Sequence, residues 1–347
     1  MTRRVGFRVD AGKTLGGGHV MRCLTLARVF RSLGHSCVFM CSSETLKVIP
    51  EDMWDRFEVR ETDPLPGGDA MPGFDLLVMD HYGMAAPEES LWREHAATIM
   101  VIDDLANRRH DCDILLDQTY GVRNEDYDDL VPAGCRRLLG AEYALLREEF
   151  ALHRQASLAR RGESLTLDRV LVSLGMTDVG GIAGRVCGIL SEIDIPHHID
   201  VVLGRDAQSY GRLQEICKRD DRFQVHSDAR NMAELMLAAD VAIGAGGTTT
   251  WERCAMGVPS LVVLLADNQT KIADLMNQAG AIGLVGDART DTDRDLQEGL
   301  LRLLADVDRL SAIGKKSSGI CDGAGARRVV DRVMELVAER ERADRYV

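Results

Sequence analysis

Short apolar runs alternate with helix-like segments along most of this chain. In the first half, the runs with the length and residue types of strands lie at 4–10, 36–41, 74–80, 98–103 and 113–118. Segments with helical periodicity separate them, most plainly at 19–33 and 86–97. Such alternation is typical of βαβ units, in which parallel strands join one sheet and helices pack on its faces. The first half is therefore predicted to fold around a parallel sheet.

A second alternating series follows a polar stretch of mixed charge at 153–168. Its strand candidates lie at 169–174, 198–204, 222–226, 240–246, 259–265 and 281–286. Its helix candidates lie at 181–191, 207–218, 230–239, 248–256 and 268–279, and the pattern from 291 onward is helical only. Because 347 residues exceed the size at which one core usually keeps growing, two domains are expected.

We therefore predict an α/β protein with two doubly wound, Rossmann-like domains that face a cleft. The expected boundaries are an N-terminal domain at 1–152, a linker at 153–168 and a C-terminal domain with the terminal helices at 169–347. Open α/β sheets bind ligands at the carboxyl ends of their strands. The loops that follow the predicted strands are therefore the places to look for a site.

Composition and missing motifs exclude several classes of function. The formal net charge is -13 and no Lys or Arg cluster is present, so a nucleic-acid partner is not expected. No apolar run approaches the roughly 20 residues of a membrane span, and we expect a cytoplasmic protein without a membrane partner. The chain has no Cys-x-x-Cys or His-Glu-x-x-His motif, and neither glycine-rich loop completes a dinucleotide fingerprint. No metal and no cofactor are therefore expected.

The segment "TLGGGHVMRC" places a histidine in the first turn of a predicted helix. Gly16, Gly17 and Gly18 follow a strand and let backbone approach a ligand, while the free N–H groups of the first turn favour negative charge. The positive end of the helix dipole opposes protonation of His19, so its ring is expected to be neutral at pH 7 and able to accept a proton. This would prepare a general base. The alternative is a glycine turn with an exposed or capping histidine.

The segment "IGAGGTTTWE" repeats the arrangement of strand, glycine loop and helix in the second half. The amides of Gly246 and Gly247 with the hydroxyls of Thr248 and Thr249 would hold a diphosphate, and Glu252 would accept hydrogen bonds from ribose hydroxyls. The loop itself contains no Lys or Arg, so binding would rely on dipoles. A tight turn with threonine caps is the alternative.

Three more post-strand segments carry polar groups. Asn268 and Gln269 in "ADNQ" offer donors and acceptors for sugar hydroxyl, acetamido or phosphate oxygens, although a plain helix cap would also explain them. Gly175 in "SLGMTD" is a further candidate phosphate contact, with a simple turn as the alternative. Asp80, His81 and Tyr82 in "MDHYG" end a strand and are expected to face the cleft. The charged segment at 101–118 is better explained as an ion-paired structural loop than as catalytic carboxylates.

Taken together, these segments closely resemble one enzyme family, the hydrolases of UDP-2,4-diacetamido-2,4,6-trideoxy-β-L-altropyranose in pseudaminic acid biosynthesis. The resemblance is carried, in order, by "RVDAGKTLGGGHVMRCLTLA", "DHYG", "VIDDLANRRHDCDILLDQ", "LLGAEYALLREEF", "IGAGGTTTWERCAMGVPSLVV" and "ADNQ". It implies a GT-B architecture and a UDP-sugar substrate. It also implies that His19 activates water, that Tyr82 and Asn268 place the sugar or support catalysis, and that the 244–252 loop grips UDP. Met176 stands where the family more often has a glycine.

The mechanism that the resemblance implies needs no metal. UDP leaves as a stable anion, so its departure needs charge stabilisation more than a strong acid. Water deprotonated by His19 would attack the anomeric carbon from the opposite face, which gives inversion. A glycosyltransferase of the same fold is the nearest rival hypothesis. A UDP-sugar epimerase and a non-catalytic nucleotide-sugar sensor are the others.

Overall fold

A computed structural model describes residues 2–12, 17–62, 73–162, 165–194 and 197–344. Gly16, which belongs to the first glycine segment, lies outside these ranges. The chain divides into two compact units. Unit 1 combines Met1–Arg147 with Ala324–Val347, and unit 2 comprises Glu148–Gly323.

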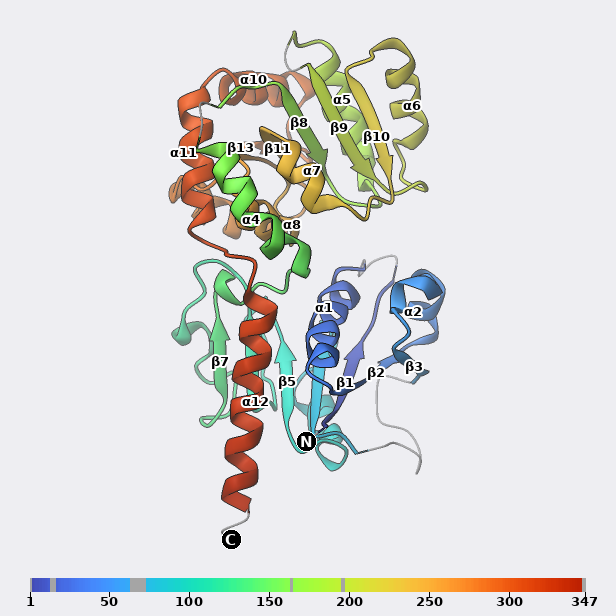
Figure 1. The fold of residues 1–347 in the computed structure, drawn as a ribbon, viewed down its shortest axis with the longest axis vertical. Helices are drawn as coiled ribbons and strands as arrows, with labels where there is room; N and C mark the ends of the chain where they lie inside the picture. Colours follow the sequence, from blue (N-terminus) through green and yellow to red (C-terminus); the bar gives the residue numbers. More distant parts are fainter. Residues whose placement is uncertain (1, 13–16, 63–72, 163–164, 195–196, 345–347) are drawn as a thin grey trace. The chain divides into compact units, whose positions relative to one another are not determined.

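Unit 1 is built on a seven-stranded parallel sheet with the order β3-β2-β1-β4-β5-β6-β7 (Figure 1). Its strands are β1 (Arg4–Val9), β2 (Ser36–Cys41), β3 (Glu58–Glu61), β4 (Leu76–Asp80), β5 (Ile99–Ile102), β6 (Ile114–Asp117) and β7 (Arg136–Leu139). Its α-helices are α1 (Gly18–Ser32), α2 (Ser43–Val48), α3 (Ala86–Leu91) and α12 (Gly325–Asp344). Short 3-10 helices lie at Glu51–Trp54, Trp92–Glu94, Asn124–Tyr127 and Ala141–Tyr143.

Both faces of this sheet are buried, which explains why its strands are nearly continuous apolar runs. On β1, Val5, Phe7 and Val9 point to one face, where the helices α1 and α12 complete the core. On β4, Leu77 and Met79 point to the other face and pack with Trp92 of the segment that follows α3. Alternate residues of each strand therefore serve two separate cores.

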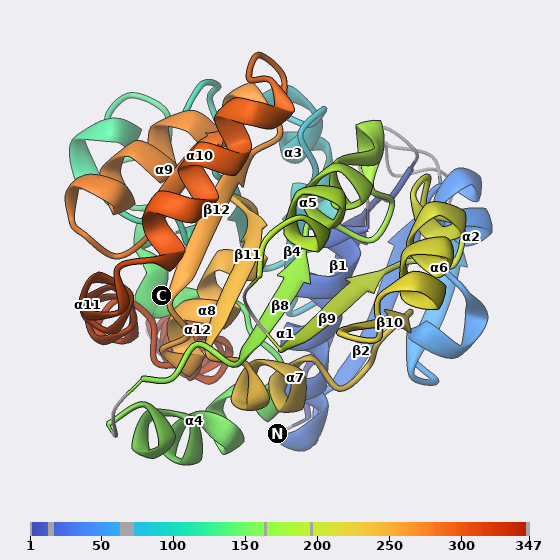
Figure 2. The same cartoon turned by 90° about the horizontal axis from the view of Figure 1, so that it is seen from above.

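Unit 2 repeats the architecture with six parallel strands in the order β10-β9-β8-β11-β12-β13. The strands are β8 (Arg169–Ser173), β9 (His198–Leu203), β10 (Phe223–Ser227), β11 (Val241–Ala245), β12 (Ser260–Leu264) and β13 (Gly283–Asp287). The helices are α4 (Glu148–Arg161), α5 (Ile182–Ser191), α6 (Tyr210–Arg219), α7 (Met232–Ala238), α8 (Thr249–Met256), α9 (Asp267–Gln278), α10 (Asp293–Leu304) and α11 (Val307–Ser318), with a 3-10 turn at Val179–Gly181. Figure 2 shows α5, α6 and α10 on one side of this sheet and α4 and α7 on the other.

Each sheet has a topological switch point, where the strand order reverses. It lies between β1 and β4 in unit 1 and between β8 and β11 in unit 2. The crevice outside the carboxyl ends of two such strands is where open α/β sheets bind ligands. The segments singled out in the sequence follow β1 and β4 in unit 1, and β8, β11 and β12 in unit 2. The predicted fold of two doubly wound, Rossmann-like α/β domains is confirmed.

The observed division of the chain differs from the expected boundaries in two ways. Residues expected to form a linker at 153–168 begin inside α4, which belongs to unit 2. This helix lacks a broad apolar stripe and is held instead by hydrogen bonds from arginines to backbone carbonyls, such as Arg154 to Ser318 at 2.7 Å and Arg161 to Met236 at 2.7 Å. The terminal segment that contains α12 belongs to unit 1, because α12 packs on α1.

Within the described residues, no helix is both long enough and apolar enough to cross a lipid bilayer.

Candidate functional site

His19 and Asp80 meet at the switch point of unit 1. His19 lies in the first turn of α1, after β1, and Asp80 is the last residue of β4. The His19 Nδ1 and an Asp80 carboxylate oxygen are 2.6 Å apart, and both side chains are buried. Since the carboxylate is the stronger acceptor, we assign the hydrogen to Nδ1, which leaves Nε2 of a neutral ring as the proton acceptor. Asp80 therefore orients His19 in the way a carboxylate orients a catalytic histidine.

Arg22 holds Asp80 from the other side. It lies one turn after His19 on α1, and its Nε and Nη2 donate to the two Asp80 oxygens at 2.5 and 2.6 Å. Its Nη1 donates to Asp104 at 3.1 Å. Burial raises the pKa of Asp80, but the charge and hydrogen bonds of Arg22, together with His19, outweigh burial and hold this pKa well below its usual range. Asp80 is therefore a fixed anion beside the imidazole.

Tyr82 lies against the His19 ring. The two ring centroids are 4.5 Å apart and the rings are nearly perpendicular, at 88°. Burial and the neighbouring Asp104 raise the pKa of Tyr82, so its hydroxyl remains protonated and able to donate at neutral pH. The structure therefore brings His19, Tyr82 and Asp80 into one cluster, as their positions after β1 and β4 indicated.

Few of the described residues lie against the helix end beside His19. Among them, a Cβ added at Gly18 would meet no atom within 4 Å, and one at Gly17 would meet only Ile49 Cδ1 at 3.6 Å. Gly17 is the N-cap of α1 and provides no side-chain hydrogen bond to the helix, and the first turn carries no acidic residue. Of the described side chains, none therefore caps the N-terminal amides of α1.

The glycine loop of unit 2 follows β11 and leads into α8. Gly246 N–H donates to Gln269 Oε1 at 3.3 Å, and Leu265 N–H donates to the same oxygen at 3.1 Å. Gln269 therefore ties the loop after β11 to the loop after β12, a structural role that the sequence did not indicate. Thr248 is the N-cap of α8, but its side chain makes no capping hydrogen bond to the helix. The alternative of a tight turn with threonine caps therefore does not explain the Thr248 hydroxyl.

The remaining predicted residues of unit 2 lie around this loop. Glu252 is half-buried in the first turn of α8, and Asn268 is exposed in the first turn of α9. Gly175 has a φ of 113°, a left-handed backbone that disfavours any other residue, and it is exposed. The carbonyl of Met176 accepts a hydrogen bond from Gly204 N–H at 2.7 Å, so this loop is fastened to the end of β9.

Gly247 provides a direct test of whether the loop faces a ligand. A Cβ added there would meet nothing within 4 Å, so Gly247→Val should leave the free energy of unfolding within about 0.5 kcal/mol of wild type. If the open space receives a diphosphate, the variant should bind UDP about tenfold more weakly or worse, measured by calorimetry. Gly211→Val on α6, where a Cβ also meets nothing, is the matched control and should bind UDP normally. Equal UDP affinity in both variants would contradict this placement.

Two residues at these sites were missed in the sequence. Arg22 follows His19 by three positions and so shares its face of the helix, a signal that was available. Arg253 lies on α8 beneath the glycine loop and donates to Thr249 Oγ1 at 3.1 Å. A guanidinium therefore lies next to the loop, although the loop itself contains none.

The charged segment after β5 forms a structural network. Arg108 pairs with Asp103 at 2.7 Å, and Tyr127 donates to the same carboxylate at 2.9 Å. His110 Nδ1 lies 2.7 Å from Glu89. Burial lowers the pKa of His110, but the neighbouring carboxylates of Asp103 and Glu89 outweigh it and raise this pKa to about 9. The interpretation of 101–118 as an ion-paired loop is confirmed for these residues.

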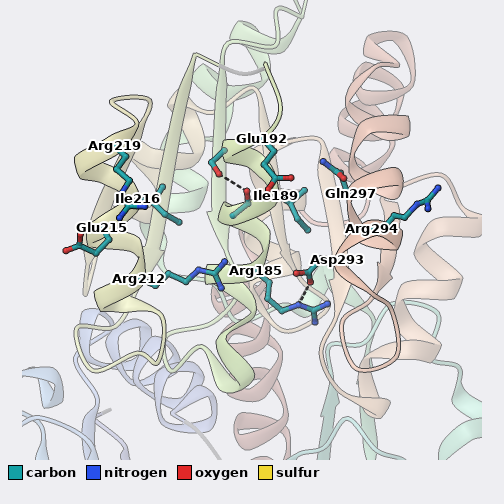
Figure 3. Close-up of a pocket in the computed structure, with 12 residues that line it drawn as sticks. Arg185, Ile189, Glu192, Arg212, Glu215, Ile216, Arg219, Asp293, Arg294 and Gln297 are labelled. Atoms are coloured by element: carbon teal, nitrogen blue, oxygen red, sulfur yellow. Dashed lines mark hydrogen bonds and ion pairs between the residues drawn. The ribbon is translucent and has the colours of Figure 1, made fainter.

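A surface pocket of about 440 Å³ lies elsewhere on unit 2, among α5, α6 and α10. Figure 3 shows Arg185 turned toward Asp293, with which it pairs at 2.7 Å. Of the residues that line this pocket, none is among those singled out in the sequence. Across the described part of the chain, no group of three or more His, Cys, Asp or Glu residues is arranged to hold a metal ion.

Known proteins resemble this chain in sequence and in fold. Residues 196–332 match the Glycosyltransferase family 28 C-terminal domain. Over 280 residues the chain is 25% identical to the UDP-2,4-diacetamido-2,4,6-trideoxy-beta-L-altropyranose hydrolase of Campylobacter jejuni, which covers 80% of this chain and 97% of that protein. The crystal structure of Acinetobacter baumannii MurG matches with a TM-score of 0.68 at 15% identity, over 96% of this chain and 99% of MurG.

A second solved structure, the UDP-GlcNAc 2-epimerase from Neisseria meningitidis bound to UDP-GlcNAc, matches with a TM-score of 0.63 at 10% identity, over 96% of this chain and all of that one (100%). At these identities the structural matches establish the fold alone. The chain therefore has two Rossmann-like domains with parallel sheets of the GT-B type, and its C-terminal half is similar to that of glycosyltransferase family 28.

Proposed function

We propose that this protein hydrolyses a UDP-linked 2,4-diacetamido-2,4,6-trideoxyhexose at the anomeric carbon, releasing UDP and the free sugar for pseudaminic acid biosynthesis. The observation that carries the proposal is the His19 and Asp80 pair at 2.6 Å, at the switch point of unit 1 and at the N-terminal end of α1. The Campylobacter jejuni hydrolase, aligned over 97% of its length, supports the choice of substrate. The glycine loop of unit 2 would take the UDP moiety.

In this mechanism His19 acts as the general base. Asp80 holds the hydrogen on Nδ1, so Nε2 takes a proton from water as that water attacks the anomeric carbon. Arg22 keeps Asp80 ionised, and Asp80 stabilises the imidazolium that forms. UDP departs as an anion, and amide dipoles at the unit 2 loop stabilise its charge. A single displacement of this kind inverts the configuration at the anomeric carbon.

The first test measures free UDP after the protein is incubated with a panel of UDP-sugars. We expect release from the UDP-linked diacetamido-trideoxyhexose, at an unchanged rate with a chelator present, and an inverted sugar anomer seen by NMR immediately after the reaction. UDP-GlcNAc serves as the control substrate and should be turned over at least tenfold more slowly, because it lacks the 4-acetamido group. Release of the sugar with retained configuration would refute the single displacement.

Glycosyl transfer is the second candidate function. The match to the Glycosyltransferase family 28 C-terminal domain and the fold shared with MurG favour it. The two functions differ in what accepts the sugar. A hydrolase releases UDP in buffer alone, whereas a transferase releases UDP only when an acceptor is added. UDP binding without turnover under either condition would support the sensor hypothesis, and a change of the sugar while it stays attached to UDP would support an epimerase.

A further inference from the structure

Arg253 is a buried cation in unit 2 that has no acidic partner among the described residues. Its side chain is 1% exposed, and no carboxylate oxygen of the described residues lies within the 4.0 Å that defines an ion pair. Buried charges in proteins are normally paired, because removing an ion from water costs several kcal/mol. Burial lowers the pKa of Arg253 to about 10, and the nearby Glu252 raises it only slightly. The guanidinium therefore stays charged at neutral pH.

The guanidinium is held by neutral acceptors around the start of α8 and on β12. Nη2 donates to Ala245 O at 2.8 Å and to Thr250 Oγ1 at 3.0 Å, and Nε donates to Ser260 Oγ at 3.1 Å. A Cβ at Gly244 would lie only 2.4 Å from Nη1, so this position on β11 must be glycine for the guanidinium to fit. Arg253 is thereby fixed at the junction of β11 and α8, below the glycine loop.

The position of Arg253 on α8 strengthens the positive potential of the loop. Its guanidinium reaches back to the N-terminal end of its own helix, where the dipole is already positive. Arg161 is the instructive contrast. Burial also lowers the pKa of Arg161 to about 10, but its guanidinium lies against the carbonyls of Met236 and Ala239 at the C-terminal end of α7. The C-terminal end of a helix favours a cation. The helix dipole of α7 therefore compensates the positive charge of Arg161, whereas no such helix end in the described part of unit 2 compensates the charge of Arg253.

Thr249 transmits the effect of Arg253 to the loop surface. Its Oγ1 accepts a hydrogen bond from Arg253 Nη1 at 3.1 Å, and no acceptor among the described residues receives its hydroxyl hydrogen. Thr249 is half-buried, at the point where the loop becomes helix. A hydroxyl whose oxygen accepts a hydrogen bond from a guanidinium is polarised, and its own hydrogen becomes a stronger donor to an anion.

We propose that Arg253 is a positioning residue for a nucleoside diphosphate, whose negative charge would compensate the charge of the guanidinium across the glycine loop. The inference rests on the proposed function, since it takes the loop as the UDP site. Arg253 itself does not touch the ligand. It sets the affinity for the diphosphate through its charge and through the hydroxyl of Thr249, while the uridine part is bound independently of it.

The test compares UDP, UMP and uridine as ligands, with Kd measured by calorimetry. Arg253→Gln should weaken UDP binding about tenfold or more, UMP binding less, and uridine binding hardly at all, because the lost attraction scales with ligand charge. Arg253→Lys should restore part of the preference for UDP over uridine. Arg161→Gln, the matched control, should leave that preference unchanged. If Arg253→Gln does not fold, Thr249→Val tests the same preference with the arginine in place and should lower it.

The outcomes separate this inference from the proposed function. A wild-type protein that binds no UDP would overturn both. A wild-type protein that binds UDP, with equal losses of UDP and uridine affinity in Arg253→Gln, would overturn the role of Arg253 alone, as would an equal change of preference in Arg161→Gln.

Discussion

Replacing His19 by alanine or asparagine should cut the turnover number by roughly 10²-fold or more, the scale expected when a general base is lost. UDP binding should persist, because the loop proposed to hold UDP belongs to unit 2, whereas His19 belongs to unit 1. The measurement is the rate of UDP release at saturating substrate, together with the Kd for UDP by calorimetry.

His35 provides the matched control for His19. It lies just before β2, at the amino ends of the strands, whereas His19 lies at their carboxyl ends. Its Nδ1 accepts a hydrogen bond from Arg3 N–H at 3.1 Å. His35→Asn should leave turnover within about twofold of wild type, as expected for a surface substitution away from the site. Wild-type turnover in His19→Ala would refute the general base, and a protein whose function survives His19→Ala but not Glu252→Ala would be a sensor.

Replacing Asp80 by asparagine should damage both activity and stability. The amide cannot hold His19 in the required tautomer, so turnover should fall by roughly 10²-fold or more. It also leaves the buried guanidinium of Arg22 without the closer of its two charge partners, which should lower the free energy of unfolding by about 3 to 5 kcal/mol. Urea unfolding followed by tryptophan fluorescence, with Trp54 and Trp92 in unit 1, measures the loss.

The pH dependence of this stabilisation has a definite sign. Because the pKa of Asp80 in the folded protein lies well below its ordinary value of 3.8, its contribution is fully present above about pH 4. The contribution is lost as the pH falls through the lower, folded-state pKa. Wild-type protein should therefore lose stability steeply below pH 4, and Asp80→Asn should lose less over the same range.

Asp331→Asn is the control for the charge change. Asp331 pairs with Arg327 at 2.9 Å on the surface of α12, and both side chains are more than half exposed. Removal of this pair should cost no more than about 0.5 kcal/mol, as is usual for exposed pairs on helices. An Asp80→Asn protein as stable as Asp331→Asn would show that Arg22 does not depend on Asp80.

The central strands of both sheets could be predicted because they are buried on both faces. Runs such as 76–79 are apolar without interruption, and few other structures explain them. β3 and β7 were missed because they are edge strands with the polar sequences EVRE and RRLL. α4 was taken for a linker because its contacts are hydrogen bonds from arginines to carbonyls, which leave no hydrophobic periodicity.

The candidate site was only half visible in the sequence. Glycine loops and polar residues after strands identify positions, and His19, Tyr82 and the loop after β11 were found in this way. The contacts among these side chains were not found, because they depend on which strand ends are neighbours. Arg22 and Asp80 are 58 positions apart and meet because β4 crosses over to pair with β1. Arg253 was missed because its charge comes from the helix below the loop.

Unit 2 is an insertion within unit 1, since the chain leaves unit 1 after Arg147 and rejoins it at Ala324. The returning helix supplies Val329, Val330 and Val333 to the first core. All residues of the inserted unit precede these valines in the chain. A released chain that ends at residue 323 would therefore contain every residue of the inserted unit, whereas the core between α1 and the sheet of unit 1 would lack α12 and be exposed to chaperones and proteases.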